Sequence, residues 1–266
     1  MEGSEQMSFL EHLEELRWKI IKAVIAILVC AIVAFIFKGF VFDEIILAPK
    51  DASFITYRLF CAFSQFAGMG DGLCLTSSFE LQNISMSGQF SSHLVVSIIA
   101  GLVVSFPYVF YQIWSFVQPG LHEKERNTAR GVVFFTSILF LLGVGFGYFV
   151  IAPLSIQFLG GYTVSDEVDN IITLDSFIST ITTTTLASGI VFQLPIVVYF
   201  LAKIGVVTPA ILRQYRKHAI VGVLIVSAII TPPDITSQIL VTIPLVILYE
   251  ISIYIARVVV RNAKKA

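Results

Sequence analysis

The 266-residue chain is 56% hydrophobic, only 13% of its residues are charged, and its formal net charge is −1. This apolar share is far above the usual share for soluble globular domains, so a soluble protein is excluded. The net charge itself says little, and no nucleic-acid partner is expected. The useful information lies in where the charges sit.

The cations of the chain are sorted along the sequence. Fourteen of the 17 Lys and Arg residues fall in four short segments that alternate with long apolar runs. The four groups are Arg17, Lys19 and Lys22; Lys124, Arg126 and Arg130; Lys203, Arg213, Arg216 and Lys217; and Arg257, Arg261, Lys264 and Lys265. Because Lys and Arg near span ends remain on the cytoplasmic side, this sorting predicts a polytopic membrane protein with both termini in the cytoplasm.

The first 19 residues are expected to form a cytoplasmic amphipathic helix that runs into the first membrane span. Ser8, followed three residues later by Glu11, is typical of a capping box. An apolar stripe at helical spacing is formed by Phe9, Leu13 and Leu16. The alternative is an interfacial anchor whose charges are merely solvated.

The apolar runs predict an all-α membrane protein, a bundle of six transmembrane helices that forms a single domain over residues 1–266. The six spans are expected at 20–37, 90–114, 131–153, 177–202, 219–230 and 235–256. Pro195 is expected to break the fourth span, since proline removes a helix hydrogen bond.

The last two spans are expected to form a short hairpin. The fifth has about 12 residues, or roughly 18 Å of helix, whereas the apolar core of a bilayer is about 30 Å thick. The sequence TPPD, which ends at Asp234, stops the helix and turns the chain. Three explanations stay open: the bilayer thins there, protein shields the mismatch, or the span boundary lies elsewhere.

Three residues are candidates for an intramembrane polar site or a contact with a partner subunit: Gln193, Pro195 and Glu250. Gln193 is expected roughly 14 Å from the inner end of span four, near the midplane, where polar groups are costly. A midplane polar site beside Gln193 would also suit a secondary transporter of a small solute. Such transporters usually consist of two halves related by a repeat, and this sequence shows no repeat.

The long segment after the first span holds two cysteines, Cys61 and Cys74, which we predict to form a disulfide. Oxidising conditions on the outer side of the membrane allow such a bridge to persist. Two free thiols in an apolar-rich loop are the alternative. Cys30 lies in the first span and is left over as an unpaired thiol.

No pattern in the sequence indicates an enzyme. The four histidines are scattered over different segments, and neither HExxH nor GxSxG occurs. No catalytic residue, metal or cofactor is therefore expected.

Five segments carry a family resemblance. HLEELRWK, at residues 12–19, resembles the N-terminal signature of TatC, the multispanning receptor subunit of the twin-arginine protein translocase. Four further segments resemble later parts of that family: FPYVFYQIWSFVQPGLHEKER, FGYFVIAPLSIQFL, FQLPIVVYFLAKIGVVTPAILRQYRKHAIVG and TPPDITSQILVTIPLVILYEI. These matches run in order along nearly the whole chain, and the segment 58–80 matches worst.

The resemblance implies a receptor in the bacterial cytoplasmic (inner) membrane, working as a homo-oligomer. TatC proteins bind S-R-R-x-F-L-K signal peptides of folded cargo proteins and recruit single-span TatA and TatB subunits, and the protonmotive force drives transport. The residues that match family signal-binding positions are Glu15, Glu125, Arg17, Phe116 and Leu121. Many family members carry Glu where this chain has Gln193.

Each of these assignments has a structural alternative. Arg17 and Lys19 would serve as topology determinants only, and Phe116 as an anchor at the membrane interface. Pro49 matches a family proline after the first span and would equally serve as a turn former.

Overall fold

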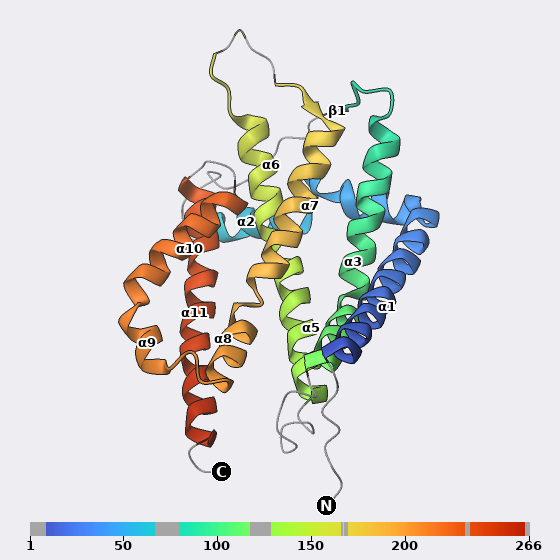
Figure 1. Cartoon of the computed structure of the whole chain (residues 1–266). Coiled ribbons are helices and arrows are strands. Elements are labelled where there is room, and N and C mark those ends of the chain that lie inside the picture. Colours follow the sequence, from blue (N-terminus) through green and yellow to red (C-terminus); the bar gives the residue numbers. More distant parts are fainter. Residues whose placement is uncertain are drawn as a thin grey trace, which may run out of the picture. The chain divides into compact units, whose positions relative to one another are not determined.

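The computed structural model describes residues 9–66, 80–117, 129–165, 167, 170–231 and 235–263. Within these ranges, five helical stretches are long and apolar enough to cross a membrane (Figure 1). They are Leu13–Ile36, Gly88–Phe116, Gly131–Gly161, Leu174–Lys203 and Gln238–Arg261. This observation confirms the prediction of a mostly helical, multi-pass membrane protein, and the expected span at 219–230 is not among these five.

The chain divides into two compact units, which are described separately. The first comprises Met1–Lys38 and His93–Ile138. The second comprises Gly39–Ser92 and Leu139–Ala266.

The first unit is formed by α1 (Phe9–Ile36), most of α3 (Gly88–Val117) and the beginning of α5 (Ala129–Phe146). No Gly or Pro interrupts the sequence of α1, so the helix runs without a break from the N-terminal segment through the first span. The amphipathic segment is therefore continuous with the helix of the first span. Ser8, the predicted capping residue, lies outside the described residues.

Small residues bring α1 and α3 close together. A Cβ added at Gly101 of α3 would lie 2.6 Å from the backbone nitrogen of Ala31 in α1. Further along the pair, the ring of His93 stacks on Phe35 with the centroids 3.9 Å apart. Close approach of backbones at small residues is how helices pack in membranes, where dispersion contacts replace the hydrophobic effect.

The second unit contains the remaining elements, most of them helical. They are η1 (Phe40–Ile46), η2 (Ala48–Lys50), α2 (Ile55–Phe66), β1 (Leu81–Gln82), η4 (Gly147–Ile151), α6 (Ala152–Gly161), β2 (Ile172–Thr173), α7 (Leu174–Val191), α8 (Leu194–Lys203), α9 (Pro209–Gln214), α10 (Arg216–Ile230) and α11 (Ile235–Ala263). The two short strands pair in parallel, with Leu81 opposite Ile172.

Pro49 lies buried in the short 3-10 helix η2, where proline suits the first turn. Its carbonyl accepts a hydrogen bond of 2.8 Å from the hydroxyl of Tyr57, which is only 4% exposed. Burial raises the pKa of Tyr57 to about 12, so the hydroxyl remains a donor at any physiological pH. Pro49 thus lies in a turn that a hydrogen bond joins to α2.

The third long helix extends further than the sequence indicated. Its expected end was Pro153, but α5 continues through the π-helical turn η4 into α6 and ends at Gly161. Pro153 lies at the start of α6, directly after the π-helical turn, and so costs fewer hydrogen bonds than in a helix interior. The packing of η4 against α7 fixes this irregular turn, and the sequence did not reveal it.

The predicted break in the fourth span is confirmed. α7 ends at Val191 and α8 begins at Leu194, with Pro195 in the first turn of α8. Gln193 occupies the N-cap position of α8, although its side chain makes no capping bond.

The final hairpin is only half as predicted. α10 has 15 residues and ends at Ile230, directly before the sequence TPPD, so the short fifth helix is present. The expectation of a short sixth span is wrong, because α11 has 29 residues and continues past Arg257 to Ala263. No Gly or Pro follows Arg257 before Ala263, so nothing in the sequence ends the helix there. Asp234 lies outside the described residues.

Candidate functional site

The predicted signal-binding residues that the structure describes belong to the first unit. Glu15 and Arg17 lie on α1, and Phe116 lies in the last turn of α3. The other two, Leu121 and Glu125, lie outside the described residues. The structure therefore tests the surroundings of Glu15 and leaves its pairing with Glu125 as a prediction.

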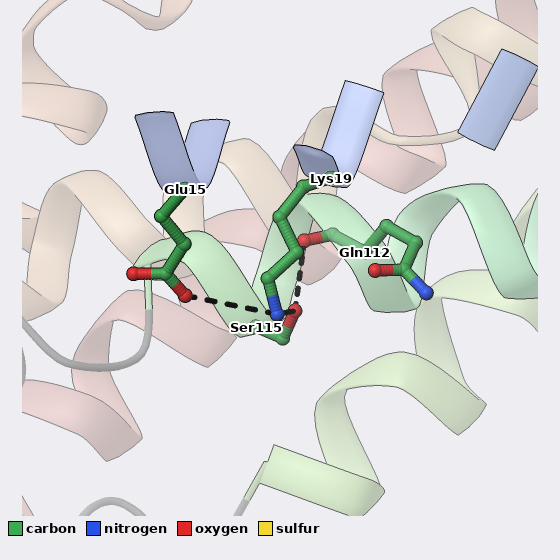
Figure 2. A network of polar contacts seen from close by, with 4 residues as sticks. All are labelled: Glu15, Lys19, Gln112 and Ser115. Carbon is green, nitrogen blue, oxygen red and sulfur yellow. Dashed lines mark hydrogen bonds and ion pairs between the residues drawn. The ribbon is translucent and has the colours of Figure 1, made fainter. Parts of the chain in front are cut away.

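Glu15 is part of a polar network that links α1 to the end of α3 (Figure 2). The Nζ of Lys19 lies 3.8 Å from Oε1 of Glu15 and donates a hydrogen bond of 2.8 Å to Oγ of Ser115. The Ser115 hydroxyl in turn donates to the backbone carbonyl of Gln112 at 3.0 Å. The Glu15 and Lys19 side chains are 30% and 23% exposed, so the carboxylate is sheltered but reachable.

Local sequence explains this arrangement. Glu15 and Lys19 are four residues apart, which places their side chains on the same face of α1. The carbonyl end of a helix carries a partial negative charge, so the last turn of α3 favours the Lys19 ammonium. The same partial negative charge repels the Glu15 carboxylate, and the nearby Lys19 ammonium offsets this repulsion.

Arg17 points to a different partner. Its guanidinium lies 3.9 Å from Glu14, both side chains are about two-thirds exposed, and its Cζ is 5.7 Å from the Trp18 ring centroid. Exposed pairs of this kind contribute only about 0–1 kcal/mol. Arg17 therefore pairs with Glu14, while the cation beside Glu15 is Lys19.

Lys19 and Ser115 are the residues that sequence reasoning missed. The spacing of Glu15 and Lys19 is a visible signal for a pair on one helix. Ser115 is 96 residues away along the chain, and no local pattern predicts that contact.

The sheltered carboxylate defines what the site can bind. A carboxylate accepts two parallel hydrogen bonds from a guanidinium, which is the strongest geometry available for recognising arginine. Phe116 is half-buried next to Ser115 and adds an apolar surface on the same turn of α3. Together they suit a cationic peptide with apolar side chains.

Gln193 lies at the break between α7 and α8 in the second unit. Its Nε2 is 3.5 Å from the carbonyl oxygen of Gly189, the limit of a hydrogen bond, and the side chain is half-buried. Pro195 is fully buried beside it. The structure thus places a polar side chain at an interrupted helix, as the sequence indicated.

Glu250 of α11 has a direct partner. Its carboxylate accepts a hydrogen bond of 2.7 Å from the Arg216 guanidinium, at the beginning of α10. The neighbouring Tyr249 donates through its hydroxyl to the carbonyl of Leu212 in α9 at 2.8 Å. Glu250 therefore ties α10 to α11, and the two side chains remain 43% and 49% exposed.

The cysteines and the acidic residues complete the inventory of predicted sites. Cys61 is disulfide-bonded, whereas Cys30 is a free thiol. Cys74, the predicted partner, lies outside the described residues, so the pairing stays a prediction. Within the described part of the chain, no group of three or more His, Cys, Asp or Glu side chains is placed to hold a metal ion.

The long apolar helices define a multi-pass helical membrane protein, and comparisons with known proteins narrow this class. The family model described as Sec-independent protein translocase protein (TatC) matches residues 11–244. A Sec-independent protein translocase protein TatC from Blattabacterium sp. subsp. Periplaneta americana is 40% identical over 253 residues, which cover 94% of this chain and 95% of that protein. The TatCy protein of Bacillus subtilis is 32% identical, over 98% of this chain and 93% of its own length.

Solved structures agree with the sequence comparisons. A crystal structure of the twin arginine translocase receptor TatC superposes with a TM-score of 0.70 at 32% identity, covering 94% of this chain and all of that one. A second crystal structure of that receptor, in DDM, gives a TM-score of 0.71 at 33% identity. The chain therefore belongs to the TatC family. These matches favour a protein translocase component over a secondary transporter.

Proposed function

We propose that this chain is the signal-peptide receptor and core subunit of a twin-arginine translocase, which exports folded proteins across the bacterial cytoplasmic membrane using the protonmotive force. Family membership supports a role in a protein translocase. The observation that supports a binding role is the sheltered carboxylate of Glu15, which lies on α1 beside the end of α3. No catalytic role is proposed for the chain.

The proposed topology has six spans with both termini in the cytoplasm. α10 serves as the fifth span although it has only 15 residues, or roughly 22 Å at 1.5 Å per residue. Its pairing with α11 supports this assignment. Oγ of Ser227 lies 2.9 Å from the Thr242 hydroxyl, so each of these polar groups has a hydrogen-bond partner within the protein and does not face lipid unpaired. With six spans, the polar network around Glu15 faces the cytoplasm, where signal peptides arrive.

Two carboxylates are proposed to receive the two adjacent arginines of the signal, namely Glu15 and Glu125. A hydrogen bond to a charged group contributes about 1.5–3 kcal/mol, so two such contacts supply about 3–6 kcal/mol. Micromolar binding corresponds to about 8.2 kcal/mol. Burying the apolar side chains that follow the arginines against Phe116 and Leu121 supplies the difference, at about 1.5–3 kcal/mol for each side chain.

Partner subunits are proposed to bind elsewhere. The interrupted helix at Gln193 and Pro195 offers a polar contact for the single spans of TatA and TatB type subunits. We also propose that several copies of this chain assemble in the working complex.

A peptide-binding measurement tests the proposed function. The full-length protein in detergent should retain a twin-Arg signal peptide much better than its twin-Lys counterpart, because only guanidinium binds a carboxylate bidentately. Glu15→Gln and Glu125→Lys should each weaken binding by about tenfold or more while the protein remains folded. Glu14→Gln is the matched control, since Glu14 is one residue away but two-thirds exposed. Equal binding by wild type and Glu15→Gln would contradict the proposal.

A further inference from the structure

Glu15 has a cation from its own chain beside it. Lys19 Nζ lies 3.8 Å from its carboxylate, and both side chains are more than two-thirds buried. We propose that Lys19 is an internal competitor for the signal peptide: it neutralises Glu15 in the empty receptor and yields the carboxylate when a guanidinium arrives. This inference rests on the proposed function, because it concerns the same carboxylate.

The geometry allows Lys19 to yield easily. Its ammonium has three donors, and one of them is directed to Ser115 Oγ at 2.8 Å, as Figure 2 shows. The Ser115 hydroxyl donates a hydrogen bond to the Gln112 carbonyl, so the lone pairs of its oxygen are available to accept a hydrogen bond from Lys19. When Glu15 turns to a peptide, Lys19 keeps this bond and stays beside the carbonyl end of α3. Lys19 therefore does not enter an apolar environment without a partner.

The incoming group also has the better contact. A distance of 3.8 Å is an ion pair without a direct hydrogen bond. A guanidinium makes two charge-assisted bonds of about 2.7–2.9 Å to the same carboxylate. The resident lysine thus weakens binding without preventing it, and it makes the receptor release its peptide faster.

Two substitutions of Lys19 should change affinity in opposite directions. Lys19→Met removes the competitor, and we expect it to tighten binding of a twin-Arg peptide about two- to fivefold, which equals about 0.4–1 kcal/mol. Lys19→Arg introduces a guanidinium that can donate hydrogen bonds directly to Glu15, and we expect it to weaken binding of the peptide by a similar factor. If Lys19 only tied α1 to α3, the first change would weaken binding and the second would preserve it.

A change at Ser115 tests the tether. Ser115→Ala leaves Lys19 free to close the 3.8 Å gap to Glu15, so the variant should bind the peptide more weakly than wild type. In the Lys19→Met background the same substitution should have no further effect, because no competitor remains to be released.

The experiment measures the anisotropy of a labelled twin-Arg peptide with the full-length protein in detergent at fixed ionic strength. Lys22→Met is the matched control: Lys22 is exposed, lies three residues further along α1 and carries the same charge. It should change affinity by less than half as much as Lys19→Met. Lys19→Arg keeps the charge and gives the second test if Lys19→Met does not fold.

The outcomes separate this inference from the proposed function. If wild type shows no preference for the twin-Arg peptide, or Glu15→Gln binds like wild type, the proposed function itself fails. If Glu15→Gln abolishes binding but Lys19→Met is unchanged or weaker, only the role of Lys19 is overturned. An equal increase in affinity for Lys22→Met would also overturn the role of Lys19, because loss of a positive charge anywhere near the site would then explain the effect.

Discussion

Gly101 is a position at which α1 and α3 leave no room for a side chain. A Cβ there would lie 2.6 Å from the backbone nitrogen of Ala31 and 2.8 Å from its Cα and Cβ. Carbon atoms in contact are normally about 3.5–4.0 Å apart, so Gly101→Ala forces the two helices apart by about 1 Å.

The cost follows from packing. Overpacking a protein core lowers the free energy of unfolding by about 1–3 kcal/mol, and the better helix propensity of Ala raises it by up to about 1 kcal/mol. The net cost lies between about 0 and 3 kcal/mol. Because three atoms of Ala31 lie within 2.8 Å of the added Cβ, the lower end is excluded, and we expect Gly101→Ala to destabilise the protein by about 1–2 kcal/mol. At about 2–4 °C per kcal/mol for a chain of this size, Tm should fall by about 2–8 °C.

Thermal unfolding of the detergent-solubilised protein measures this change, with Gly131→Ala as the matched control. A Cβ at Gly131 of α5 would meet nothing within 4 Å, so its Tm should stay the same or rise slightly. An unchanged Tm for Gly101→Ala, or an equal fall for Gly131→Ala, would refute the close contact between α1 and α3.

Three further predictions concern other parts of the chain. Tyr57→Phe should cost about 1–3 kcal/mol by leaving the buried Pro49 carbonyl without its donor. Because the pKa of Tyr57 is raised to about 12, its contribution to stability should be constant up to about pH 9 and be lost as the pH rises through 12; a loss already at pH 8 would contradict this contact. Gln193→Leu should reduce crosslinking to a single-span partner subunit by a few fold, since interhelical polar contacts contribute about 0.6–2 kcal/mol, and an unchanged yield would count against a role there. For topology, a single cysteine at Asp169 should react with an impermeant thiol reagent added outside and one at Thr128 should not; labelling of Thr128 would overturn the six-span arrangement.

Local chemistry decided which features of the fold were predictable. The long spans follow from apolar composition, and the break between α7 and α8 follows from Pro195. The helix ends were harder, because Pro153 and Arg257 look like boundaries in sequence but lie inside continuous helical stretches. A π-helical turn depends on packing against another helix, and no single-sequence pattern reports it.

The candidate site divides in the same way. Glu15 was identified through a resemblance to known proteins, and its neighbours on α1 follow from helical spacing. The hydrogen bond from Lys19 to Ser115 joins residues on two helices, so it depends on tertiary structure. That contact directs the Lys19 ammonium to Ser115 and leaves it 3.8 Å from the Glu15 carboxylate.

Site-specific crosslinking in native membranes tests most directly whether signal peptides bind beside Glu15. A twin-Arg signal peptide carrying a photo-reactive group next to its arginine pair is bound to the full-length chain, and the crosslinked fragments are identified by mass spectrometry. We expect attachment within α1, near Glu15, and a lower yield when the peptide carries two lysines or the chain carries Glu15→Gln. Crosslinks confined to α11, or an equal yield with the twin-Lys peptide, would contradict a signal-binding site at Glu15.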